Sequence, residues 1–169
     1  MLFAFAGLPG AGKTTIARLL ARELRGAYLR IDTIEQALGG AGLAELGPVG
    51  YAVAYRLASD QLQLGLSVVA DCVNPLRLTR DAWSSVAAAQ GALYWLVEVV
   101  CSDPQEHRHR IDARQPDIAG HVLPSWSAVR ALPYEPTEAL DTQRILIDSA
   151  RVTPQQAVAM ILARSGAAA

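Results

Sequence analysis

The chain has 169 residues, enough for one compact domain with a sizeable core. Hydrophobic residues make up 51% of it and charged residues only 18%, which excludes an intrinsically disordered chain. The formal net charge of −1 provides no basic field for long nucleic acids, so we expect a small-molecule substrate and no nucleic-acid partner.

Apolar runs of strand length alternate with segments of helical period along the chain. In chain order we expect a strand at 2–6, a helix at 13–24, a strand at 27–31, helices at 33–38 and 49–64, a strand at 67–71, a helix at 76–90, a strand at 92–100, a helix at 104–110, a strand at 144–147 and a helix from 154. Five strands alternating with helices predict a parallel α/β sheet covered on both faces, with ligands at the carboxyl ends of the strands.

Particular residues set several of these boundaries. Asp32 would cap the helix that follows it, and the glycines from Gly39 onward predict a flexible loop. Asp103 before Pro104 is typical of a helix start, and residues 153–156 have the spacing of a capping box. The strand at 92–100 is long enough to be central, while the proline-rich segment 113–137 has little periodicity and predicts a mobile lid.

Three features of the sequence bear on the cellular location of the protein. No stretch approaches the roughly 20 apolar residues of a membrane span, and the first residues lack the positive charge of a secretion leader. Cys72 and Cys101 each follow an apolar run, where a free thiol is typical of a small buried side chain. We therefore expect a cytoplasmic protein with reduced thiols and without a membrane partner.

The strongest motif is GLPGAGKTT, which lies between the first expected strand and the first expected helix. Its glycines let backbone N–H groups converge on phosphate, Lys13 would reach the β- and γ-phosphates, and Thr14 would bind Mg²⁺. The expected nucleotide-binding residues are Gly7, Pro9, Gly10, Ala11, Gly12, Lys13, Thr14 and Thr15. The alternative is a glycine turn that merely joins strand to helix.

A second metal ligand is expected at Asp71, which ends an apolar strand. This arrangement positions a carboxylate near a nucleotide-bound Mg²⁺. The alternative is an aspartate that only caps the end of the strand. His107, His109 and His121 also suggest a zinc site, but no cysteine or carboxylate cluster accompanies them at ligand spacing.

Four segments together resemble the small P-loop kinases, a group that includes gluconate kinase, adenylylsulfate kinase, chloramphenicol phosphotransferase, polynucleotide kinase, zeta toxin and predicted kinases assigned to the AAA family of ATPases. The segments are GLPGAGKTT, LRIDTIEQAL, VVADCVNP and HRHRIDARQPDIAGHVLPSW. The resemblance implies a P-loop NTPase three-layer sandwich with a five-stranded parallel sheet. It further implies one domain over residues 1–169, with a short lid at approximately 108–137.

The same resemblance implies roles for three kinds of residue. Asp32 would accept the proton of the attacking hydroxyl, although it could also serve only as a helix cap. Arg110 and Arg114 would join Lys13 in stabilising the transferred phosphate, and Arg108 would bind the nucleotide. Because Arg108 and Arg110 cannot share one helical face, one of them could be an ordinary surface charge.

The acceptor site departs from the pattern of relatives that act on phosphate-bearing or nucleic-acid acceptors. Those relatives often carry an arginine shortly after the aspartate, whereas this chain has Arg30 before Asp32 and Glu35 one helical turn after it. Glu35 would repel an anionic acceptor and attract a cationic or hydroxyl-rich one, unless it is simply an exposed helix residue.

Taken together, these patterns predict an ATP- and Mg²⁺-dependent phosphotransferase that acts on the hydroxyl of a small molecule, as a monomer or weak homodimer. The alternatives are a nucleotide-binding switch that acts through a protein partner and a kinase of nucleic-acid ends.

Overall fold

A five-stranded, all-parallel sheet forms the centre of the protein. The computed structural model describes residues 1–43, 45–137 and 143–167, and within them the strand order is β2-β3-β1-β4-β5. The strands are β1 (Leu2–Ala6), β2 (Ala27–Arg30), β3 (Val68–Asp71), β4 (Tyr94–Val100) and β5 (Arg144–Asp148). The alternating pattern of the sequence therefore predicted both the class and the number of strands in the described part of the chain.

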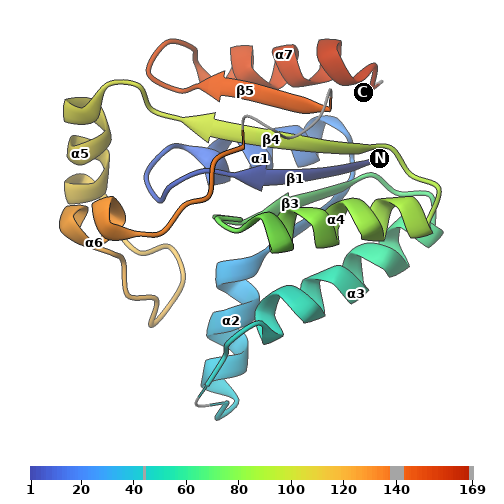
Figure 1. Ribbon diagram of the computed structural model, residues 1–169, viewed down its shortest axis with the longest axis horizontal. Helices are drawn as coiled ribbons and strands as arrows, with labels where there is room; N and C mark the ends of the chain where they lie inside the picture. Colours follow the sequence, from blue (N-terminus) through green and yellow to red (C-terminus); the bar gives the residue numbers. More distant parts are fainter. Residues whose placement is uncertain (44, 138–142, 168–169) are drawn as a thin grey trace.

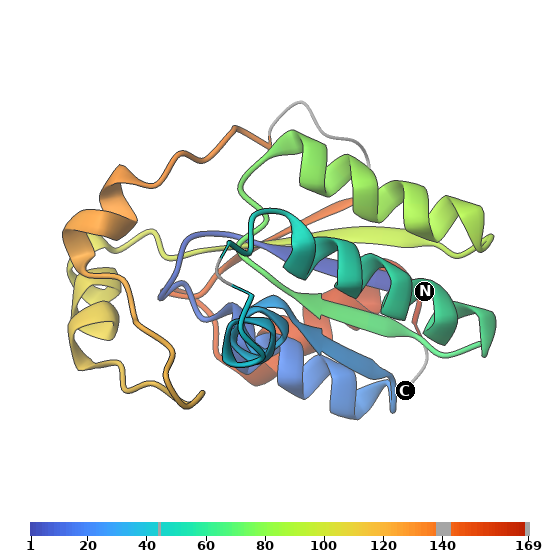
Figure 2. The same ribbon diagram turned by 90° about the horizontal axis from the view of Figure 1, so that it is seen from below.

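Helices cover both faces of this sheet (Figures 1 and 2). They are α1 (Lys13–Glu23), α2 (Ile31–Gly40), α3 (Val49–Gln63), α4 (Arg77–Ala89), α5 (Pro104–Ala113), α6 (Trp126–Ala131) and α7 (Pro154–Ser165). α1 and α7 pack on one face, and α3 and α4 pack on the other, which gives three layers. α5 and α6 lie beyond the carboxyl ends of the strands, beside the loop that follows β1.

The middle strand, β1, explains why the core has two halves. All five of its residues are completely buried. Phe3 and Phe5 join the cluster under α1 and α7, while Leu2 and Ala4 join the cluster that contains Trp83 of α4. Side chains that alternate between two covered faces favour an uninterrupted apolar run, as the sequence has here.

The expectation that the strand at 92–100 would be central is confirmed. β4 lies between β1 and β5, so it has a strand on each side, although β1 occupies the middle of the sheet. Its apolar run is typical of a strand that is covered on both faces.

The expected cap at Asp32 is wrong. α2 begins at Ile31, its N-cap is Arg30, and no side chain caps it. Arg30 has an extended conformation, so the chain passes from β2 into α2 without an intervening turn, and Asp32 lies within the first helical turn. Its carboxylate lies toward the guanidinium of Arg30, at 3.5 Å, instead of toward the helix N–H groups. The helix also continues through Gly39 to Gly40, where the sequence predicted a loop.

Other local signals are confirmed. The Asp103 carboxylate accepts hydrogen bonds from two backbone N–H groups of α5, and Thr153 and Gln156 form the expected capping box of α7. The lid segment contains a short helix, α6, that its proline content did not predict. The side chain of Ser125 caps the start of this helix. No helix in the described ranges is both long and apolar enough to cross a membrane.

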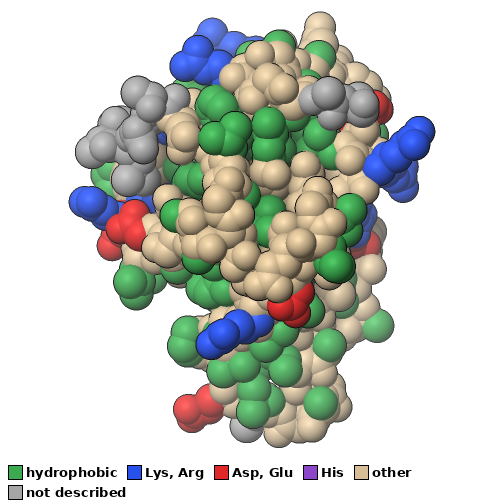
Figure 3. Space-filling view, turned by 90° about the vertical axis from the view of Figure 1, so that its right-hand side faces the viewer, with side chains coloured by type: hydrophobic (Ala, Val, Ile, Leu, Met, Phe, Trp, Pro, Cys, Tyr) green, Lys and Arg blue, Asp and Glu red, His purple; other side chains and the backbone are tan. Residues whose placement is uncertain are grey.

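Charge is unevenly distributed between the two ends of the sheet. Figure 3 shows the end where the strands begin, and among the described residues of that face the acidic and basic side chains are scattered and form no large patch of one charge. The opposite end, where the strands finish, carries the clustered acidic and basic residues described next.

Candidate active site

A glycine loop connects β1 to α1, and its backbone conformation requires glycine. Gly7, Gly10 and Gly12 have positive φ angles of 131°, 81° and 95°. A Cβ on Gly7 would lie 2.1 Å from the carbonyl oxygen of Val99, so a side chain there would displace either the loop or β4. Gly12 is the N-cap of α1, and no side chain caps that helix, which leaves its positive end available to an anion.

Lys13 is folded back against this loop. Its Nζ donates a hydrogen bond to the carbonyl oxygen of Leu8 at 2.9 Å, and the residue is only 7% exposed. Burial lowers the pKa of Lys13 from its usual value, and the nearby charge of Asp71 opposes that shift. An anion at the loop would therefore meet a cation that is already held at the edge of the cavity.

A cavity of about 470 Å³ lies over the glycine loop and brings together most of the residues expected to act. Those that line it are Pro9, Gly10, Gly12, Lys13, Thr14, Thr15, Asp32, Asp71, Arg110 and Arg114. We call it the phosphate cavity. Gly7 and Ala11 instead line a separate cavity of about 360 Å³ on the other side of the loop.

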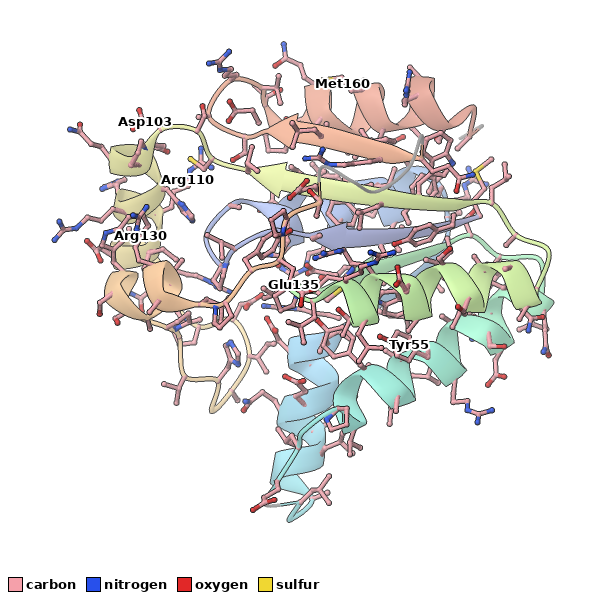
Figure 4. All side chains as sticks on the ribbon, viewed as in Figure 1. Tyr55, Asp103, Arg110, Arg130, Glu135 and Met160 are labelled. Atoms are coloured by element: carbon pink, nitrogen blue, oxygen red, sulfur yellow. The ribbon has the colours of Figure 1, made fainter. Side chains whose placement is uncertain are left out.

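Arg108 does not line the phosphate cavity. Its side chain is 65% exposed and pairs with Asp112 one helical turn along α5, at 3.4 Å. Arg110 pairs with Glu106 one turn earlier at 2.8 Å, but its guanidinium also leaves the helix to donate to the Ser149 hydroxyl at 2.8 Å and to the Ser149 carbonyl at 3.1 Å. Figure 4 shows Arg110 pointing from α5 toward the strands. The two arginines are therefore on different faces, as the sequence spacing required.

Arg114 reaches the phosphate cavity by a route that the sequence did not indicate. It was expected on the same helical face as Arg110, but it is the C-cap of α5 and has an extended conformation, so it lies outside the helix. Both arginines nonetheless line the cavity.

Thr14 and Asp71 offer the donor set that Mg²⁺ prefers. Asp71 ends β3 with a side chain that is 3% exposed, and it accepts a hydrogen bond from the Tyr28 hydroxyl at 2.6 Å. A hydroxyl and a carboxylate on one phosphate cavity fit Mg²⁺, which takes its other ligands from water and phosphate. Across the described residues there is no group of three or more His, Cys, Asp or Glu side chains that could hold a metal, so the zinc interpretation has no support there.

Arg30 connects three carboxylates at the edge of the cavity. The residue is 4% exposed, and its guanidinium donates two hydrogen bonds to Asp117, at 2.8 and 3.0 Å. Asp32 lies 3.5 Å away and Asp71 lies 3.9 Å away. Hydrogen bonds from Arg30 and from Arg18 lower the pKa of Asp117 well below its usual range.

Sequence reasoning missed Asp117, Arg18 and Tyr28. Asp117 lies in the proline-rich segment, 87 residues from Arg30, and although it falls within the last segment of the family resemblance, that resemblance gave it no role. Arg18 lies on α1 and Tyr28 on β2, where each fits an ordinary periodic pattern. A pairing between distant side chains leaves no local signal, so only the structure could find this group.

A further cavity of about 330 Å³ adjoins the phosphate cavity, and we call it the acceptor chamber. The two share Pro9, Asp32, Val73 and Pro124, and the remaining lining residues are Ile31, Glu35, Tyr51, Pro75, Ala128, Val129 and Leu132. Asp32 therefore stands where the two cavities meet.

The short helices α5 and α6 close these cavities and also support the glycine loop. His107 Nε2 lies 2.7 Å from the carbonyl oxygen of Pro9, and the His107 ring meets the Trp126 ring edge to face at 5.2 Å. Trp126 thus packs within the lid against a residue that contacts the loop.

Comparison with known proteins identifies the family. The family model AAA_33, described as an AAA domain, matches residues 2–133. The chain belongs to this family. A search of curated proteins finds no match.

Solved structures show the same fold in this AAA_33 member as in P-loop kinases. A putative kinase from Chloroflexus aurantiacus superposes with a TM-score of 0.73 at 20% identity, covering 96% of this chain and 97% of that one. The APS kinase CysC of Mycobacterium tuberculosis, in complex with AMPPNP and APS, gives 0.65 at 18%, covering 98% and 97%. Kti12 of Chaetomium thermophilum, in complex with ADP-AlF3, gives 0.70 at 19%, covering 97% and 98%. The protein therefore has the P-loop NTPase fold that these kinases share.

Proposed function

We propose that the protein transfers the γ-phosphate of ATP, in the presence of Mg²⁺, to a hydroxyl group of a small molecule. The observation that carries this proposal is the position of Asp32, at the junction of a cavity lined by phosphate-binding groups and a chamber large enough for an acceptor. The kinases among the structural neighbours support it by fold.

Each group of residues has its own role in the transfer of phosphate. The loop N–H groups and Lys13 hold the phosphates, and Thr14 with Asp71 would hold Mg²⁺, which neutralises phosphate charge when bound. Asp32 accepts the proton of the acceptor hydroxyl as its oxygen bonds to the γ-phosphorus and the bond to the β-phosphate oxygen breaks. Arg110 and Arg114 offset the charge that spreads over the transferred group.

The test is transfer of labelled γ-phosphate from ATP to a fractionated pool of small metabolites. The wild type is compared with Asp32→Asn, and with Asp60→Asn as a matched control on the exposed surface of α3. We expect a labelled product that disappears in Asp32→Asn but not in Asp60→Asn, while calorimetry finds ATP binding unchanged in both variants.

Two results would contradict the proposal. Free phosphate as the sole product, at equal rates in wild type and Asp32→Asn, would favour a nucleotide-dependent switch. Label transferred to oligonucleotide ends instead of metabolites, with binding weakened by salt, would favour a nucleic-acid end kinase.

A further inference from the structure

The acceptor chamber has a distinct chemical character. Two carboxylates, Asp32 and Glu35, and the aromatic ring of Tyr51 line it, and the rest of its wall is apolar. The described residues that line it include no lysine, arginine or histidine. A molecule in this chamber would therefore meet negative charge without a compensating cation from the wall.

The nearest cations cannot reverse this charge because they are already engaged. Arg30 directs both terminal nitrogens of its guanidinium at Asp117, and Arg18 donates to the same carboxylate at 2.7 Å. Asp71 also lies 3.9 Å from Arg30. Arg30 also lies 3.5 Å from Asp32, so its single positive charge is shared among three carboxylates, and it lines the phosphate cavity and not the acceptor chamber.

Glu35 is the group in the chamber without an assigned role. Among the described residues it has no hydrogen-bond or ion-pair partner. It is half-buried where α2 meets α3, and its side chain packs on Gly50, where a Cβ would come within 2.5 Å of Glu35 Cγ. Burial, and then the charge of Asp32, raise the pKa of Glu35, so the carboxylate is held where its charge is unfavourable.

Function offers a reason for this placement. We propose that the acceptor is an amine-bearing alcohol, whose ammonium group pairs with Glu35 while its hydroxyl lies at Asp32. An ammonium would compensate the charge of Glu35, and the aromatic side chain of Tyr51, which favours cations, lines the same chamber. The apolar wall suits the carbon skeleton between amine and hydroxyl. This inference rests on the proposed phosphotransferase function.

The test measures acceptor binding and phosphate transfer separately. The probes are a series of amino alcohols of increasing chain length, each matched with a diol and a hydroxy acid of the same length. Calorimetry measures their binding to the protein saturated with Mg²⁺ and a non-hydrolysable ATP analogue. The variants are wild type, Glu35→Gln, and Glu23→Gln as a control at the exposed end of α1.

We expect amino alcohols to bind wild type and Glu23→Gln at least about 10-fold more tightly than their matched diols, with hydroxy acids weakest. Glu35→Gln should remove the preference by weakening the amino alcohols alone, and a single cooperative melting transition at or above the wild-type temperature would exclude misfolding. In transfer assays the same variant should raise KM for amino alcohols and leave kcat within about 3-fold.

Binding that favours diols or hydroxy acids, or an amine preference that survives in Glu35→Gln, would overturn the inference whatever the transfer assay gives. A Glu35-dependent amine preference without any phosphate transfer would support the inference about the chamber and overturn the phosphotransferase. Failure of the amine inference and failure of the proposed phosphotransferase function would therefore give different results.

Discussion

Asp117 of the lid accepts two hydrogen bonds from Arg30 at the end of β2, at 2.8 and 3.0 Å, across 87 residues of chain. The guanidinium is almost completely buried, so this pairing fixes the lid segment after α5 directly to the sheet. The same carboxylate also accepts from Arg18 of α1. One lid residue therefore joins two elements that frame the phosphate cavity.

Replacing Asp117 with asparagine should release the lid. The change leaves the charge of buried Arg30 without its main partner, at a cost of about 1–3 kcal/mol to the closed arrangement. Hydrogen exchange over residues 114–125 should become faster, while exchange in β1 stays the same. Asp112→Asn is the matched control, because Asp112 is exposed and pairs with exposed Arg108. Equal exchange in both variants would show that the pairing does not hold the lid.

The lid attachment should be insensitive to mild acid. Its two arginine partners lower the pKa of Asp117, so its stabilising effect is complete above the ordinary aspartate pKa of about 3.9 and is lost only as pH falls toward the lowered value. Exchange over residues 114–125, corrected for the intrinsic pH dependence, should therefore be constant from about pH 8 to pH 5. Release of the lid within that range would contradict this assignment.

Arg110 and Arg108 provide a matched pair on α5. Arg110 lines the phosphate cavity, whereas Arg108 points to solvent. Arg110→Ala should lower kcat about 100-fold, the usual effect of removing a group that stabilises transition-state charge. Arg108→Ala should remain within about 3-fold of wild type in both kcat and nucleotide affinity. Similar losses of kcat in Arg110→Ala and Arg108→Ala would show that Arg110 acts only through the stability of α5.

Lys13 is the only lysine in the sequence, so a reagent that reacts with lysine side chains reports on this position alone. Its lowered pKa leaves more of the neutral amine that attacks aldehydes. Pyridoxal phosphate followed by borohydride should label a peptide containing Lys13, and ATP with Mg²⁺ should block the reaction. Lys13→Ala should weaken ATP binding about 10- to 100-fold in calorimetry. Unchanged affinity would remove Lys13 from the phosphate site.

Glu35 should make the protein without acceptor less stable at neutral pH. Because the folded-state pKa is raised, stability falls as pH rises from the unfolded value of about 4.3 through the folded value and is then constant. Glu35→Gln should therefore melt at a higher temperature than wild type at pH 7, and the difference should vanish near pH 3. Glu23→Gln should show no gain at either pH. A lower melting temperature for Glu35→Gln at pH 7 would mean that its carboxylate stabilises the fold.

The sequence predicted the elements whose causes are local. The strand at 2–6 and the caps at Asp103 and Thr153 follow from apolar runs and from side chains that bind their own neighbours along the chain. The glycine loop was equally clear, because its conformation depends on glycines at fixed positions. These signals also placed Lys13, Asp32 and Asp71 correctly on one cavity.

Features that depend on distant residues could not be predicted in this way. The carboxylate of Asp32 was expected at the helix N-terminus, but Arg30 attracts it, and Arg30 is itself held by Asp117. The acceptor chamber combines residues of α2, α3 and α6 with the loop after β3, so its charge and shape exist only after packing. The exposure of Arg108 and the inward position of Arg110 likewise depend on how α5 meets the sheet.

The position of β1 has a consequence for biosynthesis. β1 is the earliest strand in chain order, yet both of its neighbours come much later, since Leu2 pairs with Val68 on one side and with Tyr94 on the other. Contacts between strands so far apart in the sequence form slowly, and the pairing of β1 with β4 cannot be complete until the ribosome has passed Glu98. The glycine loop is therefore translated well before the strands that hold it in place, so nucleotides cannot stabilise the nascent chain until β4 has been synthesised.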